Sequence, residues 1–170
     1  DQRAGTVQPL AYAYGLARAA HGAGARLYID SPVTGYMRAG GRWQITTPAG
    51  RVRAASVIVA TQGYSEQAFG RFQQNLVPFN FFQFATAPLP QDIRRTILPE
   101  GQGAWDTNLV LSSYRLDFAG RLIVGSVGQV DGFAQELHLQ WARRTLQKVF
   151  PQVGQTSFEH SWHGCIAMTT

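Results

Sequence analysis

The sequence predicts an α+β fold in two parts, and three observations support this assignment. Residues 1–75 contain a helical stretch and two apolar, strand-like segments, typical of a partial α/β lobe. Between those two segments, short alternating stretches are separated by glycine and proline turns, which indicates a β-meander in the crossover position. Residues 76–170 combine several strands with few helices, which predicts an antiparallel sheet with flanking helices.

A helix is expected first, over residues 8–21. Pro9 suits its first turn, and Gly22 and Gly24 end it. Its apolar side recurs at helical spacing and comprises Leu10, Ala13, Tyr14, Ala17 and Ala20. Residues 26–30, RLYID, are then predicted to form a strand.

The meander is predicted from residues 33–39, 41–47 and 50–55, and a buried strand over residues 56–60 follows it. That last segment, SVIVA, is rich in β-branched residues, as strands buried on both faces are. The residues directly after it, TQG, are small or polar. Since ligands bind beyond the carboxyl ends of parallel strands, TQG is consistent with room for a ligand, and a tight turn explains it equally well.

The second part opens with a phenylalanine-rich strand over residues 76–87, whose aromatic side chains are expected in the core. A short helix is predicted over residues 91–98. Residues 109–116 and 121–127 are predicted to pair as a hairpin, because a turn sequence, DFAG, separates them.

The longest helix is predicted over residues 134–150 and ends before Pro151. The side chains expected to face inward from it are Leu137, Trp141, Leu146 and Val149. Residues 157–169 form a last extended segment. Together these elements complete the predicted antiparallel layer.

Composition excludes several classes of protein. With 45% hydrophobic and 15% charged residues among 170, the chain has globular values, and no apolar run approaches the roughly 20 residues of a membrane span. A single cysteine, Cys165, excludes an internal disulfide and favours a cytoplasmic location. The net charge of +5 comes from dispersed arginines, which argues against nucleic acid and suits phosphate or carboxylate ligands.

Local motifs for self-contained catalysis are missing from the sequence. It contains no GxGxxG, P-loop or GxSxG pattern. His160 and His163 are three residues apart in an extended segment, which directs them to opposite faces and makes them a poor metal pair. The residues therefore predict no metal site, and no catalytic residue is assigned.

Several stretches, taken in order, resemble one family. They are GTVQPLAYAYGLARAAHGAGARLYIDSPVTG from Gly5, SVIVATQGYS from Ser56, FATAPL from Phe84, SSYRLDFAGRLIVGS from Ser112, and SWHGCIAMTT from Ser161. This ordered set resembles the D-amino-acid oxidase-like superfamily of FAD-dependent oxidoreductases, and most of all its γ-glutamylputrescine oxidase-like branch. The resemblance covers essentially the whole chain.

The resemblance implies FAD as the cofactor. Residues 1–75 are then a partial FAD-binding lobe, and residues 76–170 a substrate-binding domain. In the family, the backbone at the position of Val33 meets the adenine, and a backbone wall lies beside the phosphates and ribityl chain. The residues matching that wall or approaching the flavin are Ala60, Thr61, Gly63 and Gly164.

The resemblance also implies a small amine or amino-acid substrate, whose C–N bond is oxidised by hydride transfer to FAD. Arg115, on the predicted sheet, is the candidate anchor for a substrate carboxylate. An equally good interpretation is that Arg115 pairs with Asp117 or another carboxylate of the chain. Trp162 is a candidate substrate contact, and an ordinary core tryptophan is the alternative.

Two family segments have no counterpart in this sequence: the glycine-rich first strand–turn–helix and the last glycine-rich segment over the flavin. The chain is therefore expected to be an internal piece of a larger flavoenzyme. It is expected to purify without FAD and without activity, and to self-associate as a homodimer through exposed strand edges. The alternative function is a non-catalytic module that binds an anion or a protein.

Overall fold

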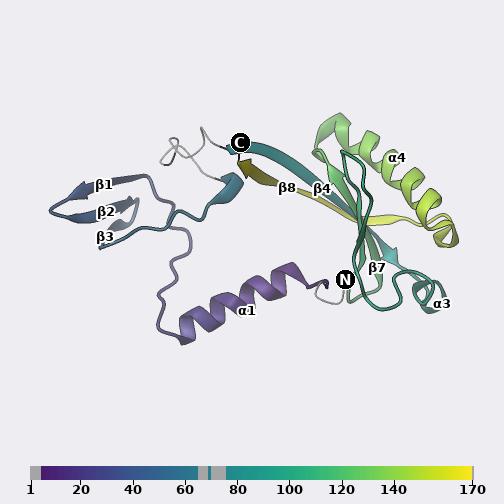
Figure 1. Ribbon diagram of the computed structural model, residues 1–170, viewed down its shortest axis with the longest axis horizontal. Coiled ribbons are helices and arrows are strands. Elements are labelled where there is room, and N and C mark those ends of the chain that lie inside the picture. Colours follow the sequence, from purple (N-terminus) through teal and green to yellow (C-terminus); the bar gives the residue numbers. More distant parts are fainter. Residues whose placement is uncertain (1–4, 65–68, 70–75, 170) are drawn as a thin grey trace. The chain divides into compact units, whose positions relative to one another are not determined.

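A computed structural model describes residues 5–64, 69 and 76–169 (Figure 1). The elements, in chain order, are α1 (Pro9–Gly22), β1 (Gly35–Ala39), β2 (Arg42–Thr47), β3 (Gly50–Ala54), the 3-10 turn η1 (Gln62–Tyr64), β4 (Leu76–Pro88), α3 (Gln91–Arg94), β5 (Ala104–Trp105), β6 (Ser113–Leu116), β7 (Arg121–Val127), α4 (Gly132–Val149), the 3-10 turn η3 (Pro151–Val153) and β8 (Phe158–Thr169). No helix in these ranges is both long and apolar enough to cross a bilayer.

The chain divides into two compact units, and each is described by itself. The sheet unit comprises Asp1–Tyr12 and Phe79–Cys165, and the meander unit comprises Ala13–Pro78 and Ile166–Thr170. The predicted assignment of residues 1–75 to a cofactor lobe and 76–170 to a substrate domain concerns function, and it stays a prediction.

The sheet unit is built on a five-stranded sheet in the order β5-β6-β7-β4-β8. The strands β6 and β7 form the predicted hairpin, with Arg115 opposite Ile123, and β7 pairs antiparallel with β4, with Ile123 opposite Ala85. Residues opposite one another in antiparallel strands point to the same face. The predicted α+β class, with an antiparallel sheet flanked by helices, is confirmed.

One face of this sheet carries the core, and α4 covers that face (Figure 1). Phe82 is 1% exposed and meets Trp141 of the helix edge to face, with ring centroids 5.4 Å apart. Tyr114 meets Phe150 in the same manner at 5.5 Å. Burying a large apolar side chain contributes about 1.5–3 kcal/mol, so these contacts hold the helix to the sheet.

The inward face of α4 differs from the prediction. Leu146 and Trp141 pack on the core as expected, but Leu137 is 56% exposed and Val149 is 43% exposed. The side chains that face the sheet recur every four residues through His138, Ala142 and Leu146. The prediction followed the largest apolar residues, whereas the sheet accepts a small alanine and a histidine stacked on Phe82.

Two elements of the sheet unit, β6 and α3, are shorter than predicted. Strand β6 begins at Ser113 instead of residue 109, because residues 106–112 form a loop. Helix α3 ends at Arg94, and the chain turns at Leu98, whose φ is +46°. Beyond Arg94, the N–H groups of Thr96 and Ile97 donate to carbonyls only three residues back, so the α-helical hydrogen-bond pattern ends before this turn.

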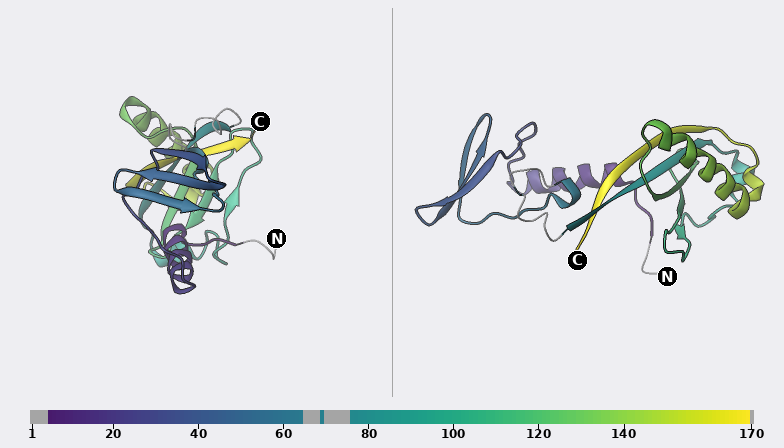
Figure 2. Two further views of the ribbon diagram at one scale, coloured as in Figure 1. Left: turned by 90° about the vertical axis from the view of Figure 1, so that its left-hand side faces the viewer. Right: turned by 90° about the horizontal axis from the view of Figure 1, so that it is seen from above.

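In the meander unit, β1, β2 and β3 form an antiparallel three-stranded sheet, visible side by side in Figure 2. Tyr36 lies opposite Ile45, and Ile45 opposite Val52. Tyr36 also stacks on Phe69 with ring centroids 5.2 Å apart. The predicted meander is confirmed.

The two parallel strands predicted beside the meander are wrong. Residues 26–30 and 56–60 form no strand, and Ile29 and Ile58 are 84% and 90% exposed. A strand exists only with a hydrogen-bonded neighbour, and no hydrogen bond among the described residues involves the backbone of residues 56–60. The β-branched sequence therefore has no partner to pair with in the described part of the chain.

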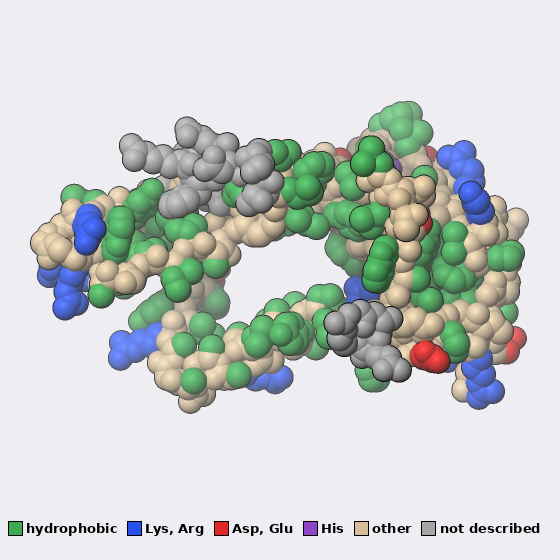
Figure 3. Space-filling model, viewed as in Figure 1, with side chains coloured by type: hydrophobic (Ala, Val, Ile, Leu, Met, Phe, Trp, Pro, Cys, Tyr) green, Lys and Arg blue, Asp and Glu red, His purple; other side chains and the backbone are tan. Residues whose placement is uncertain are grey.

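Helix α1 forms as predicted, but it buries none of its residues. Leu10 and Tyr14 of its apolar stripe are 67% and 62% exposed. Figure 3 shows hydrophobic side chains on the surface along this helix. The apolar stripe of α1 therefore packs against nothing in the described structure.

Candidate functional site

Arg115, the predicted carboxylate anchor, lies on the sheet face that α4 does not cover. Tyr114, its neighbour on β6, points into the core, and alternation along a strand directs Arg115 to the opposite face. The Arg115 side chain is half-buried, and its Nη1 donates to the backbone oxygen of Val7 at 3.1 Å. A guanidinium has five N–H donors, so most of them remain for another acceptor.

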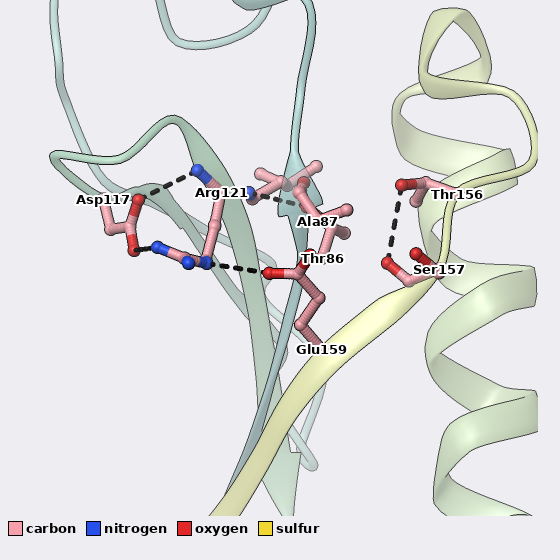
Figure 4. A network of polar contacts seen from close by, with 8 residues as sticks. Thr86, Ala87, Asp117, Arg121, Thr156, Ser157 and Glu159 are labelled. Carbon is pink, nitrogen blue, oxygen red and sulfur yellow. Dashed lines mark hydrogen bonds and ion pairs between the residues drawn. The ribbon is translucent and has the colours of Figure 1, made fainter.

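The alternative pairing of Arg115 with Asp117 is not observed. Asp117 belongs instead to a network with Arg121 and Glu159 (Figure 4). The Arg121 backbone N donates to Asp117 Oδ1 at 2.8 Å, and its Nε donates to Glu159 Oε2 at 3.3 Å. Within the described residues, Arg115 forms no ion pair, whereas Arg121 has two carboxylates.

The segment before α1 covers part of the sheet unit near Arg115. Thr6 Oγ1 donates to the backbone oxygen of Gly101 at 2.8 Å. A Cβ at Gly103 would lie 3.0 Å from the Thr6 methyl group, so glycine allows this close approach. The Val7 carbonyl is thereby held where Arg115 can reach it.

Trp162 and Gly164 lie on β8, at the other side of the same sheet. Strands β7 and β4 separate β8 from β6, so the strands that carry Arg115 and Trp162 are about 14 Å apart at a strand spacing near 4.8 Å. Trp162 is 42% exposed and is therefore no buried core residue. The structure does not bring these two candidate substrate residues into contact.

The remaining candidates lie in the meander unit. Val33, Thr61 and Gly63 are half-buried, and Ala60 is exposed. Residues 62–64 form the 3-10 turn η1, in which the Tyr64 N–H donates to the Thr61 carbonyl at 2.9 Å. The tight-turn interpretation of this stretch therefore holds, and its contact with a cofactor stays a prediction.

Sequence reasoning missed Gln62, which fixes this turn. Its φ of +48° is unusual for a residue other than glycine. Its side chain donates to the Ala167 carbonyl at 2.7 Å and accepts from the Ala167 N–H at 2.9 Å, and it also accepts from the Gly63 N–H at 2.7 Å. Two of these hydrogen bonds join η1 to the end of β8, and the third lies within the turn. No local sequence pattern signals this contact.

These residues fit only part of a dinucleotide site. Small side chains and the unpaired backbone of residues 56–60 suit a wall beside a cofactor. Pyrophosphate is usually held by a glycine-rich turn between a strand and a helix. In residues 5–64, α1 follows no strand, and the described residues supply no such turn. They therefore fit a wall beside FAD, but the described residues supply no turn that would bind its pyrophosphate.

The histidines do not form a metal site. No group of three or more His, Cys, Asp or Glu side chains in the described part could hold a metal ion. His138 stacks on Phe82 with ring centroids 4.4 Å apart, and His163 Nδ1 accepts from the Val130 N–H at 3.3 Å. Both have structural contacts.

Asp106, another residue that the sequence did not single out, organises the loop before β6. Its Oδ1 accepts from the N–H groups of Asn108 and Ser112, each at 3.1 Å. Burial pushes the Asp106 pKa upward, but the hydrogen bonds from Ser112 and Asn108 outweigh it and hold the pKa below its ordinary value of 3.8. The loop beyond it exposes Leu109 completely.

Comparisons with known proteins agree in their assignment. A family model described as FAD dependent oxidoreductase, DAO, matches residues 1–170. The probable oxidoreductase OrdL of Haemophilus influenzae is 30% identical over 99% of this chain, and the gamma-glutamylputrescine oxidoreductase of Escherichia coli is also 30% identical over 99%. The chain spans only 39% and 40% of the lengths of these two relatives.

A solved structure supports the same fold. The crystal structure of glycine oxidase from Geobacillus kaustophilus superposes on 92% of this chain with a TM-score of 0.69 and 20% sequence identity. The matched region is 41% of that protein. At this identity the similarity concerns the fold.

Proposed function

The chain belongs to the FAD dependent oxidoreductase family, DAO, and from this premise we propose that the intact protein oxidises the C–N bond of an amine or amino acid. The names of a gamma-glutamylputrescine oxidoreductase and a glycine oxidase among the similar proteins support this substrate class. FAD, when bound, supplies the hydride acceptor, and the protein orients the substrate. Because the chain spans about two fifths of its relatives, the proposal concerns the intact protein.

The observation that carries the proposal is the state of Arg115. Its guanidinium is half-buried on the sheet face opposite α4, and it contacts one backbone carbonyl and no carboxylate among the described residues. A partly desolvated guanidinium is stabilised by an anion, and its planar fork matches a carboxylate. In this proposal Arg115 binds the substrate carboxylate, and Trp162 contacts the substrate separately from Arg115.

The cofactor contacts are proposed from the meander unit and from β8. Val33 would meet the adenine, and Ala60, Thr61 and Gly63 would form a backbone wall beside the phosphates and ribityl chain. Gly164 would approach the flavin. The half-burial of Val33, Thr61 and Gly63 and the open backbone of residues 56–60 are compatible with these roles.

Substitution of Arg115 in the intact, FAD-loaded protein tests the proposal. Arg115→Ala should lower kcat/KM for a carboxylate-bearing amine by roughly 30- to 900-fold, which corresponds to about 2–4 kcal/mol of transition-state binding. Arg115→Lys should recover part of this loss, because it keeps the charge and loses the bidentate fork. The measurement is anaerobic flavin reduction by stopped-flow absorbance over a series of amines.

Arg143→Ala is the matched control, since Arg143 is an exposed arginine of α4 that forms no ion pair with a described residue. It should keep kcat/KM within about twofold, as a surface substitution does. Unchanged kcat/KM in Arg115→Ala on every amine would move substrate binding elsewhere. An intact protein without flavin absorbance would favour the alternative of an anion- or protein-binding module. The cytoplasmic location and the homodimer stay predictions.

A further inference from the structure

A second arginine, Arg94, lies in an unusual position at the turn of the β6–β7 hairpin. Its side chain rests directly on Gly120, where an added Cβ would be 2.5 Å from Arg94 Nη1 and 2.9 Å from Cζ. Gly120 is buried and has a φ of +81°. The turn therefore requires glycine for its backbone angle and for the space that the guanidinium occupies.

The Arg94 guanidinium lacks an acceptor in this position. Its Nε is buried without a hydrogen-bond partner, and no described residue forms an ion pair with it. Arg121, in the same hairpin, shows the usual arrangement, since Asp117 and Glu159 both bind it. Buried polar groups almost always have a partner, so the unpaired Nε points to an acceptor that comes from outside the described residues.

A shallow surface depression, open to solvent and called the cavity below, adjoins this guanidinium. Its volume is about 290 Å³, and its lining includes Gln91, Arg94, Arg95, Leu98, Pro99 and Leu116. Two arginines make it positive. Asp117 also lines it, but its carboxylate already binds Arg121. The volume is at the lower limit of about 300–1,000 Å³ for ligand pockets, which suits a phosphate-sized ion and excludes a dinucleotide.

We propose that Arg94 and Arg95 bind a small oxyanion, a phosphate or a short carboxylate, in the cavity between α3 and the β6–β7 turn. The planar guanidinium of Arg94 matches the oxygens of either anion, and it forms no ion pair with a described residue. The site is separate from the proposed substrate anchor, because Leu116 lines this cavity whereas Arg115 does not. Binding would tie α3 to the hairpin and stabilise the sheet unit.

Calorimetric titration with phosphate, and separately with acetate, tests the proposal at constant ionic strength with chloride as the reference salt. The wild-type protein should bind at least one of the two anions saturably, and the anion that binds identifies the source. Arg94→Gln should weaken that binding at least tenfold, and Arg94→Lys should weaken it less, because lysine keeps the charge. Arg143→Gln, an exposed arginine outside the cavity, should stay within twofold of wild type.

A second variant covers the case in which Arg94→Gln does not fold. Arg95 is exposed and lines the cavity, so Arg95→Gln should fold and weaken anion binding several-fold. The ¹⁵N resonance of Arg94 Nε should also shift on titration, and the resonances of the Arg143 side chain should not. The proposal is overturned if wild type binds neither anion saturably, or if Arg94→Gln and Arg95→Gln bind as wild type does.

Discussion

The two units of this chain carry similar strand-forming sequences and reach different structures. Phe84 in β4 is 1% exposed, whereas Ile58 in residues 56–60 is 90% exposed. Strand β4 has a hydrogen-bonded neighbour on each side, and residues 56–60 have none among the described residues. Among the described residues of the meander unit, Phe69 is the single buried one. An apolar, strand-forming sequence therefore becomes a strand only where a hydrogen-bonded neighbour is present.

The largest expected effect on stability comes from a substitution in the buried core of the sheet unit. Phe84→Ala should lower the free energy of unfolding by about 3–5 kcal/mol, because it leaves a cavity in the core. Ile58→Ala, which removes an apolar side chain from a 90% exposed position, should change it by less than about 0.5 kcal/mol. Chemical denaturation followed by tryptophan fluorescence measures both. Equal losses would contradict the account.

A smaller difference in stability is expected between alanine substitutions of one strand glycine in each sheet. Gly125→Ala should cost about 1–3 kcal/mol, since the new Cβ would lie 2.5 Å from the Phe82 carbonyl oxygen in the middle of the sheet. Gly35→Ala in β1, where nothing lies within 4 Å, should be neutral or slightly stabilising. The Tm of the two variants measures this difference. A larger drop in Tm from Gly35→Ala would contradict the conclusion that the sheet containing Gly125 is the more tightly packed one.

The smallest effect concerns the loop that leads into β6. Since the folded-state pKa of Asp106 lies below 3.8, its hydrogen bonds stabilise the folded state above that pH and are lost as the pH falls through the folded pKa. The difference in Tm between wild type and Asp106→Ala should therefore be constant at neutral pH and close below pH 3.8. A difference that persists unchanged to pH 2 would show that the carboxylate charge has no part in it.

Much of the fold could be predicted from the sequence, because local patterns decide the elements that have neighbours. The meander, the β6–β7 hairpin, β4, β8 and α4 follow from alternation, turn residues and helical spacing. The register of α4 could not be predicted, since Leu137 and His138 exchange roles only when the shape of the sheet is known. The strands predicted over residues 26–30 and 56–60 are absent, because strand formation depends on a partner that the local sequence does not specify.

The sequence could indicate which residues belong to the candidate site, but it could not indicate how their side chains are arranged. The sequence singled out Arg115, and the structure gives it a half-buried position without a carboxylate. The sequence could not reveal the two hydrogen bonds between Gln62 and Ala167, because they join residues 105 positions apart. The unpaired Nε of Arg94 was equally hidden, since it depends on the contact with Gly120.

Hydrogen exchange of the 170-residue chain, read by mass spectrometry at peptide resolution, tests whether residues 56–60 lack a strand partner. We expect amides of β4 and β7 to exchange at least about a thousandfold more slowly than unprotected amides, because opening these paired strands costs several kcal/mol of free energy. Amides of residues 26–28 and 56–60 should exchange at nearly the unprotected rate. Protection of residues 56–60 equal to that of β7 would contradict the claim that this strand-like sequence lacks a partner.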